Sequence, residues 1–139
     1  MNAIDTNIFV YLMDEYEPGK QVKAFSLLER LASRHEDTVL LWQVAIEFVS
    51  CLRRWEREGR IDLATTCEHV EHLQATFRCV MPSECILLNS LELSSRYSLS
   101  YWDSLLLAAC VDAGVETLYS EDLGHGMIYD TVSVVNPFL

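Results

Sequence analysis

Apolar and polar residues follow two different rhythms along this chain of 139 residues. Short apolar runs bounded by polar or turn-forming residues predict strands at residues 3–4, 38–41, 78–81, 117–119 and 132–135. Between them, apolar residues recur at spacings of three and four, which is the pattern of helices. We expect a short helix directly after the first strand, and further helices at residues 22–34, 43–58, 62–75, 83–97 and 102–111. Strands separated by helices favour a mostly parallel sheet with helices on both faces, a three-layer α/β/α sandwich.

The predicted helix at residues 22–34 is amphipathic. Val22, Phe25, Leu28, Leu31 and Ala32 recur at helical spacing, so we expect them to form its apolar face. All three prolines fall at predicted element boundaries, and the chain contains no repeat, linker or low-complexity tract. We therefore expect residues 1–139 to form one domain.

The composition limits the expected environment of the protein. No apolar run reaches the roughly 20 residues of a membrane helix, and Asp5 lies where a secretory signal would need a basic start and an apolar core. We therefore expect a cytoplasmic protein without membrane contacts. The five cysteines are odd in number and include no Cys-x-x-Cys pair, which suits reduced thiols and argues against a zinc site.

The charge balance is strongly acidic. Ten Lys and Arg residues stand against 21 Asp and Glu residues, giving a formal charge of −11. This balance argues against a general nucleic-acid binder, because contacts to phosphates need a basic surface. Two bound divalent cations would raise the charge from −11 to −7. Four arginines also fall within eight positions, at 53, 54, 57 and 60, so a local basic patch can coexist with an acidic whole.

Four acidic residues lie in apolar or strand-ending surroundings. Asp5 and Asp122 each follow a predicted strand, whereas Glu47 and Asp103 lie in apolar helices. Open α/β sheets bind ligands at the carboxyl ends of their strands. Several carboxylates that converge on one cleft form an oxygen-ligand site for Mg²⁺ or Mn²⁺. The hypothesis is that these four acids share such a site.

Each helical acid also has a simpler interpretation. Gln43, Glu47 and Ser50 share one narrow stripe of their helix, which could be a solvent-facing seam. Continued along the helix, the stripe reaches Arg54 and Arg57, an arrangement that would suit a metal site with a phosphate-binding extension. We therefore expect Arg54 and Arg57 to contact phosphate groups of a bound ligand, the alternative being ion pairs with Glu56, Glu58 or Asp62.

The other two acids are equally open to two interpretations. Ser100 and Asp103 form a Ser-x-x-Asp pattern, in which Asp103 could merely satisfy a free amide at the start of its helix. The apolar residues that follow Asp103 instead favour a helix start that points into the protein, where an uncompensated carboxylate is costly. Asp122 lies in a Ser-Glu-Asp-Leu-Gly run that could be an ordinary turn. Glu121 and Asp122 cannot both point inward easily, and we select Asp122 as the ligand.

Several common catalytic motifs are missing from the sequence. There is no Ser-His-Asp order, no Walker loop and no G-x-G-x-x-G, which disfavours triad hydrolases, P-loop enzymes and dinucleotide binders. Two function classes stay open for such a site. One is a catalytically silent interaction module, and the other is a small-molecule phosphohydrolase, since a carboxylate metal site suits any phosphate ester.

The four acidic segments together resemble a known family. Ile-Asp-Thr-Asn-Ile at residues 4–8, Glu47 in an apolar helix, Tyr-Trp-Asp-Ser-Leu-Leu-Leu-Ala-Ala at 101–109, Ser-Glu-Asp-Leu at 120–123 and Val-Val-Asn-Pro-Phe at 134–138 look like a PIN domain, specifically a VapC-type toxin ribonuclease. The resemblance covers the whole chain. It implies a Rossmann-like sandwich, a Mg²⁺ or Mn²⁺ cofactor, and endonucleolytic cleavage of RNA to 5′-phosphate and 3′-hydroxyl ends.

The resemblance also implies roles and partners. The metal-binding and catalytic acids would be Asp5, Glu47, Asp103 and Asp122. Asn7 and Ser120 match supporting polar positions. The partners would be an RNA substrate and a cognate antitoxin protein that inhibits the enzyme, and the chain is expected to form a homodimer.

Overall fold

The computed structural model describes residues 1–33 and 37–139. In these residues one sheet is formed by six strands: β1 (Asn2–Ile4), β2 (Thr38–Leu41), β3 (Arg78–Val80), β4 (Thr117–Tyr119), β5 (Ile128–Tyr129) and β6 (Val132–Val135). The same residues include six helices: α1 (Thr6–Met13), α2 (Pro18–Ser33), α3 (Trp42–Arg57), α4 (Leu63–Thr76), α5 (Ile86–Tyr97) and α6 (Tyr101–Ala113). The strand order across the sheet is β3-β2-β1-β4-β6-β5.

The first strand lies in the middle of the sheet. Ala3 pairs with Val39 of β2 on one side and with Leu118 of β4 on the other, and both pairings are parallel. All three of these residues are buried. This burial matches the physics of parallel sheets, which are covered on both faces and therefore favour uninterrupted apolar runs.

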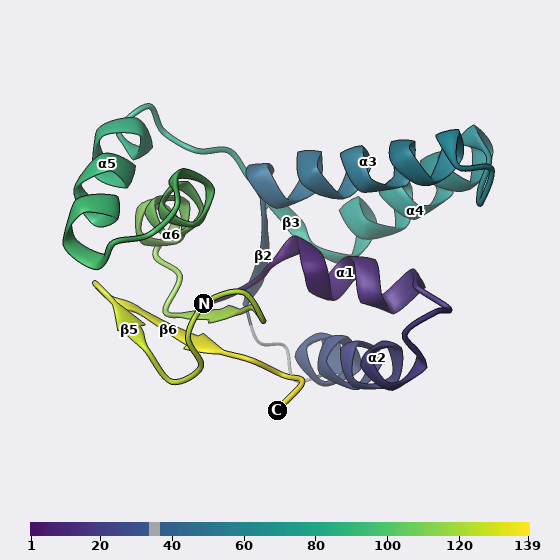
Figure 1. Cartoon of the computed structure of the whole chain (residues 1–139), viewed down its shortest axis with the longest axis horizontal. Helices are drawn as coiled ribbons and strands as arrows, with labels where there is room; N and C mark the ends of the chain where they lie inside the picture. The colour runs from purple at the N-terminus through teal and green to yellow at the C-terminus, as the bar shows by residue number, and fades with distance from the viewer. Residues whose placement is uncertain (34–36) are drawn as a thin grey trace.

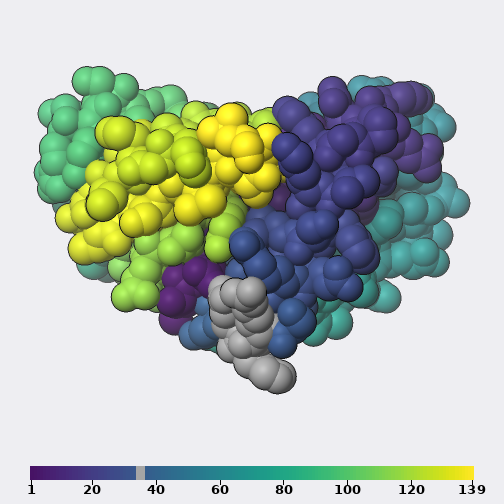
Figure 2. All heavy atoms as spheres, turned by 90° about the horizontal axis from the view of Figure 1, so that it is seen from below, coloured from purple at the N-terminus to yellow at the C-terminus, as the bar shows by residue number. Residues whose placement is uncertain are grey.

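The helices form two outer layers. In Figure 1, α1 to α4 lie on one side of the sheet and α5 and α6 lie on the other, so the expected three-layer α/β/α sandwich is confirmed. The view from below in Figure 2 shows an outline notched between the yellow C-terminal segment and the purple and dark blue region of α1 and α2. None of the helices within residues 1–33 and 37–139 is both long enough and apolar enough to cross a membrane.

The apolar face of α2 differs from the expectation. Val22 and Phe25 are 66% and 57% exposed, whereas the buried residues are Ala24, Leu27 and Leu31. The helix contains two apolar stripes, and the stripe that includes the small Ala24 is the one that packs inward. The expected end of this helix at Arg34 lies outside the described residues.

One strand is absent from the sequence-based prediction. β5 has only two residues and pairs antiparallel with β6 through a turn in which Asp130 has φ 55°. A two-residue strand is too short to show an alternating pattern, so the periodicity of the sequence does not detect it.

The five cysteines are all free thiols, as expected.

Candidate active site

Asp5 lies where β1 ends and α1 begins, and its carboxylate is bonded on both oxygens. Oδ1 accepts the backbone N–H of Thr6 at 2.7 Å, so Asp5 is the N-cap of α1. Oδ2 accepts the hydroxyl of Ser120 at 2.7 Å, which ties β1 to the end of β4. Only 7% of Asp5 is exposed. The strand-helix junction therefore holds this carboxylate inside the protein.

Glu47 of α3 points toward the same junction. Its Oε2 accepts the hydroxyl of Thr6 at 2.9 Å, and its Oε1 accepts Nε2 of Gln43 at 3.1 Å. Glu47 is only partly exposed. The stripe of Gln43 and Glu47 thus faces the start of α1, and this geometry disfavours a purely solvent-facing seam.

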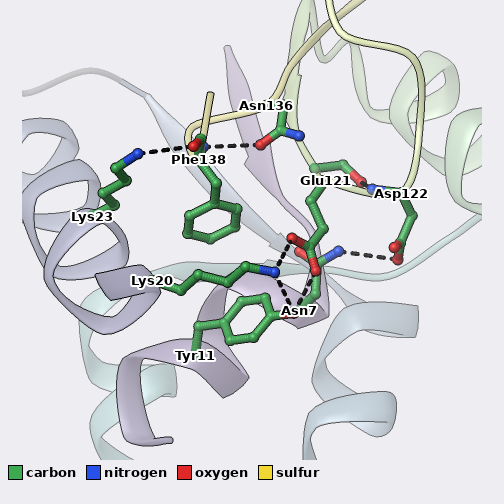
Figure 3. Close-up of polar contacts among 9 residues, drawn as sticks. Asn7, Tyr11, Lys20, Lys23, Glu121, Asp122, Asn136 and Phe138 are labelled. Carbon is green, nitrogen blue, oxygen red and sulfur yellow. Dashed lines mark hydrogen bonds and ion pairs between the residues drawn. The ribbon is translucent and has the colours of Figure 1, made fainter. Parts of the chain in front are cut away.

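Asp122 approaches from the loop after β4. Its Oδ2 accepts Nδ2 of Asn7 at 3.0 Å, and its backbone N–H donates to the Ser120 hydroxyl at 3.2 Å. Ser120 therefore contacts both Asp5 and the Asp122 backbone, while Asn7 holds the Asp122 side chain. Glu121, the neighbouring acid, points away toward Tyr11, as Figure 3 shows.

Asp103 lies in the first turn of α6. The helix cap is made by Ser100, whose hydroxyl oxygen accepts the Asp103 N–H at 3.2 Å. The Asp103 carboxylate is half-buried and has no hydrogen bond or ion pair within residues 1–33 and 37–139. Nε2 of Gln43 donates to the carbonyl of Trp102 at 3.3 Å, which places the start of α6 beside the Glu47 helix. The capping interpretation thus accounts for the amide of Asp103 and leaves its carboxylate available.

Burial controls the electrostatics of the site. It raises the pKa of Asp5 from 3.8 to about 6, against the hydrogen bonds from Ser120 and Thr6, which lower it. The negative charges of Asp122 and Glu47 raise this pKa further. The carboxylates of Glu47 and Asp122 are therefore close enough to repel that of Asp5, which a bound cation would relieve.

The residues fit a hard divalent cation in donor type. Carboxylate and amide oxygens are the ligands that Mg²⁺ and Mn²⁺ prefer. Two amide oxygens beside the acids, Oδ1 of Asn7 and Oε1 of Gln43, are buried without a hydrogen-bond partner. In this conformation, however, no three acidic, histidine or cysteine side chains of the described residues converge closely enough to hold one ion. Asp5, Glu47 and Asp122 instead bond to Thr6, Asn7, Gln43 and Ser120.

The two arginines on the Glu47 helix are exposed. Arg54 has a contact of 3.5 Å from Nη2 to the Cys51 sulfur, and Arg57 points to solvent. The neighbouring Arg53 pairs with Glu56 at 3.5 Å. Within the described part of the chain, Arg54 and Arg57 form no ion pair with Glu56, Glu58 or Asp62. Their contact with phosphate stays a prediction.

Some polar residues of the site were absent from the sequence-based prediction. Thr6 bonds both Asp5 and Glu47, and Gln43 links Glu47 to α6. Gln43 could have been found from its position one helical turn before Glu47. Thr6 offered only its place between Asp5 and Asn7, and nothing local distinguishes a hydroxyl that bonds a distant carboxylate.

Comparison with known proteins identifies the fold family. The family model of the PIN domain matches residues 3–127. The fold is similar to a toxin–antitoxin complex from Klebsiella pneumoniae, with a TM-score of 0.67 and 20% identity over 99% of this chain and 98% of that chain. It is also similar to a VapBC complex from Rickettsia felis bound to a promoter DNA fragment, with a TM-score of 0.71 and 13% identity over 96% of each chain. A sarcin–ricin loop cleaving VapC toxin from Mycobacterium tuberculosis aligns with a TM-score of 0.58 and 15% identity, over 86% of this chain and 88% of that chain.

At these identities the structural likeness shows the fold alone. No curated protein matches the chain. The PIN-domain match, by contrast, includes Asp5, Glu47, Asp103 and Asp122 and extends over most of the sequence. The chain therefore belongs to the PIN-domain family.

Proposed function

We propose that this chain is a metal-dependent endoribonuclease of the VapC type, the toxin of a toxin–antitoxin module. The observation that carries the proposal is the approach of Asp5, Glu47 and Asp122 to one strand-helix junction from three distant parts of the chain. A buried carboxylate surrounded by further acids is costly unless a cation compensates it. Similarity to toxin–antitoxin structures supports the choice of substrate and partner.

The roles of the residues follow from their contacts. Asp5, Glu47, Asp103 and Asp122 would hold Mg²⁺ or Mn²⁺, and the bound cation would supply a hydroxide nucleophile by lowering the pKa of water. Ser120 and Thr6 donate to the carboxylates and fix which oxygens remain free. Asn7 orients Asp122. Such hydrogen bonds around metal ligands set the geometry of the site and its affinity.

The proposal is tested by RNA cleavage. The purified chain is incubated with a mixture of single-stranded and looped RNAs, with Mg²⁺ or Mn²⁺, beside Asp5→Asn and the control Glu68→Gln, an exposed acid on α4. We expect cuts that leave 5′-phosphate and 3′-hydroxyl ends, a loss of more than about 100-fold in Asp5→Asn, and no loss in the control.

Other results of the same experiment would support other functions. Turnover of a chromogenic phosphate ester without RNA cleavage would indicate a small-molecule phosphohydrolase. Metal and antitoxin binding without any turnover would indicate a silent interaction module.

An apolar groove supports the antitoxin as a partner. It has a volume of about 520 Å³, and its lining includes Phe9 of α1, Phe25 of α2, Phe48 of α3 and Phe77, the residue after α4. A groove of this kind suits the apolar face of a helix, and the charge of −11 suits a basic extension of the same partner. Phe25→Glu, on the exposed rim, should prevent an antitoxin from inhibiting cleavage while leaving cleavage intact.

A second apolar surface supports the homodimer. Trp42, Ile46, Met81 and Trp102 are between 39% and 62% exposed, and they line a pocket of about 140 Å³ between α3, α5 and α6. Three exposed leucines, at 87, 88 and 91, lie on α5, the helix that also contributes Ile86 to this pocket. Because soluble proteins rarely expose large apolar patches, we assign this surface, the α5 patch, to a second copy of the chain.

A further inference from the structure

Two consecutive acids, Glu121 and Asp122, follow β4, and their side chains point in different directions. Asp122 accepts a hydrogen bond from Nδ2 of Asn7 at 3.0 Å, at the acidic site. Glu121 instead accepts the Tyr11 hydroxyl at 2.5 Å on Oε1 and the Lys20 ammonium at 2.8 Å on Oε2. Figure 3 shows both arrangements side by side, with Lys20 between Tyr11 and the Glu121 carboxylate. Each Glu121 oxygen thus has its own donor.

The three partners of this contact, Tyr11, Lys20 and Glu121, also bond to one another and are partly buried. Nζ of Lys20 donates to the Tyr11 oxygen at 3.0 Å and lies 4.4 Å from the centre of the Tyr11 ring. The Phe138 ring packs edge-on against Tyr11 at 5.2 Å and lies 5.5 Å from the ammonium. The Glu121 and Lys20 side chains are only 19% and 35% exposed. A partly shielded, charge-assisted network of this kind is stronger than an isolated surface ion pair.

Alternatives to this arrangement would disturb the acidic site. Glu121 is one residue from both Ser120, which bonds Asp5, and Asp122, which bonds Asn7. Without its partners, Glu121 would no longer hold the segment that carries Ser120 and Asp122. Rotation of the loop would also move Asp122 away from Asn7.

We propose that Lys20, Tyr11 and Glu121 form a clamp that positions Asp122 for metal binding. The clamp joins α1 and α2 to the loop after β4, and it selects Asp122 instead of Glu121 as the acid that faces the site. The residues of the clamp are positioning residues and do not touch the substrate. This inference rests on the proposed function, because it takes Asp122 as a ligand of the divalent ion.

The test compares Lys20→Met with Lys20→Arg and with Lys23→Met. Lys23 lies on the same helix and donates to the Phe138 carbonyl at 2.8 Å. Among the described residues it forms no hydrogen bond or ion pair with Tyr11 or Glu121, so it is a control for the loss of a lysine charge beside the clamp. Mn²⁺ affinity is measured by calorimetry, and RNA cleavage is measured at limiting and at saturating Mn²⁺. The position of Asn7 is followed through its side-chain amide signals in nitrogen-15 spectra.

The clamp predicts a specific set of results. Lys20→Met should weaken Mn²⁺ binding about 10-fold, within the range seen when residues that orient metal ligands are removed. Its cleavage should fall at limiting Mn²⁺ and recover at saturating Mn²⁺, and the Asn7 amide signals should shift. Lys20→Arg should retain most of the affinity, and Lys23→Met should behave as wild type.

Failure of the clamp and failure of the proposed function give different results. If wild type binds Mn²⁺ and Lys20→Met binds it equally well, the clamp has no positioning role and the proposed function stands. If the wild-type chain itself neither binds Mn²⁺ nor cleaves RNA, both proposals are wrong. Equal weakening in Lys23→Met would also overturn the clamp, because the effect would then follow from general loss of charge on α2.

Discussion

At the scale of single residues, Asp5 is the group on which most of the site depends. It caps α1, bonds the end of β4 through Ser120, and carries the raised pKa. Hydrogen bonds from Ser120 and Thr6 stabilise its charged form, yet burial outweighs them. A carboxylate so placed is destabilising at neutral pH without a cation, which is the usual compromise of a binding site.

This residue gives a pH-dependent prediction. The pKa of Asp5 is about 6 in the folded chain, against an ordinary value of 3.8 for an exposed aspartate. When folding raises the pKa of an acid, the folded state holds the proton more tightly than the unfolded state does. The resulting stability is fully present below the unfolded-state pKa and is lost as the pH rises through the folded-state pKa. Without metal, Asp5 should therefore lower the free energy of unfolding by up to about 3 kcal/mol between pH 4 and pH 7.

The measurement is urea unfolding of wild type and Asp5→Asn across this pH range. The free energy of unfolding of Asp5→Asn should exceed that of wild type by an amount that grows as the pH rises. Saturating Mn²⁺ should raise the free energy of unfolding of wild type and so reverse this difference. Parallel pH profiles of stability for the two proteins would show that burial does not raise the pKa of the Asp5 carboxyl group.

At the scale of elements, α3 carries both a proposed metal ligand, Glu47, and the proposed phosphate contacts. One face buries Val44, Phe48, Leu52 and Trp55 in the core, and another presents Glu47 to the start of α1. Arg54 is seven residues beyond Glu47, about two turns and roughly 10 Å along the axis. The separation spans one to two nucleotides, so a backbone bound at the acids could reach the arginines.

The arginines therefore give an element-level prediction. Arg54→Ala and Arg57→Ala should each weaken RNA binding to a similar extent for all RNA sequences. Each should also reduce the salt dependence of RNA affinity by the amount expected for about one lost phosphate contact. Metal affinity should not change. Arg53→Ala is the matched control, because Arg53 already pairs with Glu56. Cleavage rates against salt concentration decide the matter, and identical slopes in all four proteins would mean that these arginines do not contact RNA.

At the scale of the whole molecule, net charge and apolar surface point to association. A formal charge of −11 favours basic partners and opposes contact between identical copies. The α5 patch, which has large exposed side chains, offers apolar burial that can exceed this repulsion. The acidic site lies next to the patch, since Gln43 lines its pocket and also holds Glu47.

The patch predicts the state of association. The chain alone should have the mass of a dimer in light scattering, and Leu88→Glu, at a side chain that is 77% exposed, should yield a monomer with unchanged thermal stability of the fold. Val22→Glu, an exposed apolar residue on α2, is the control and should remain dimeric. A wild-type monomer at high concentration would exclude this use of the surface.

Much of the fold could be predicted from the sequence because its signals are local. Strands and helices were identified by the spacing of apolar residues, and a parallel sheet followed from their alternation. The errors have physical causes. β5 is too short to show a periodic pattern. α2 has two apolar stripes, and the elements that pack against the helix decide which of the two is buried.

The candidate site divides in the same way. By itself, the sequence determined the fold class, indicated the PIN family and marked four candidate acids. An acid in an apolar run or after a strand is unusual wherever it occurs, which is why these four could be selected. The tertiary structure alone decided which groups meet: Thr6 with Glu47, Ser120 with Asp5, and Glu121 with Lys20 and Tyr11. These contacts join residues 41 to 115 positions apart. The direction of a side chain across such a distance depends on how sheet and helices pack, and no local pattern encodes it.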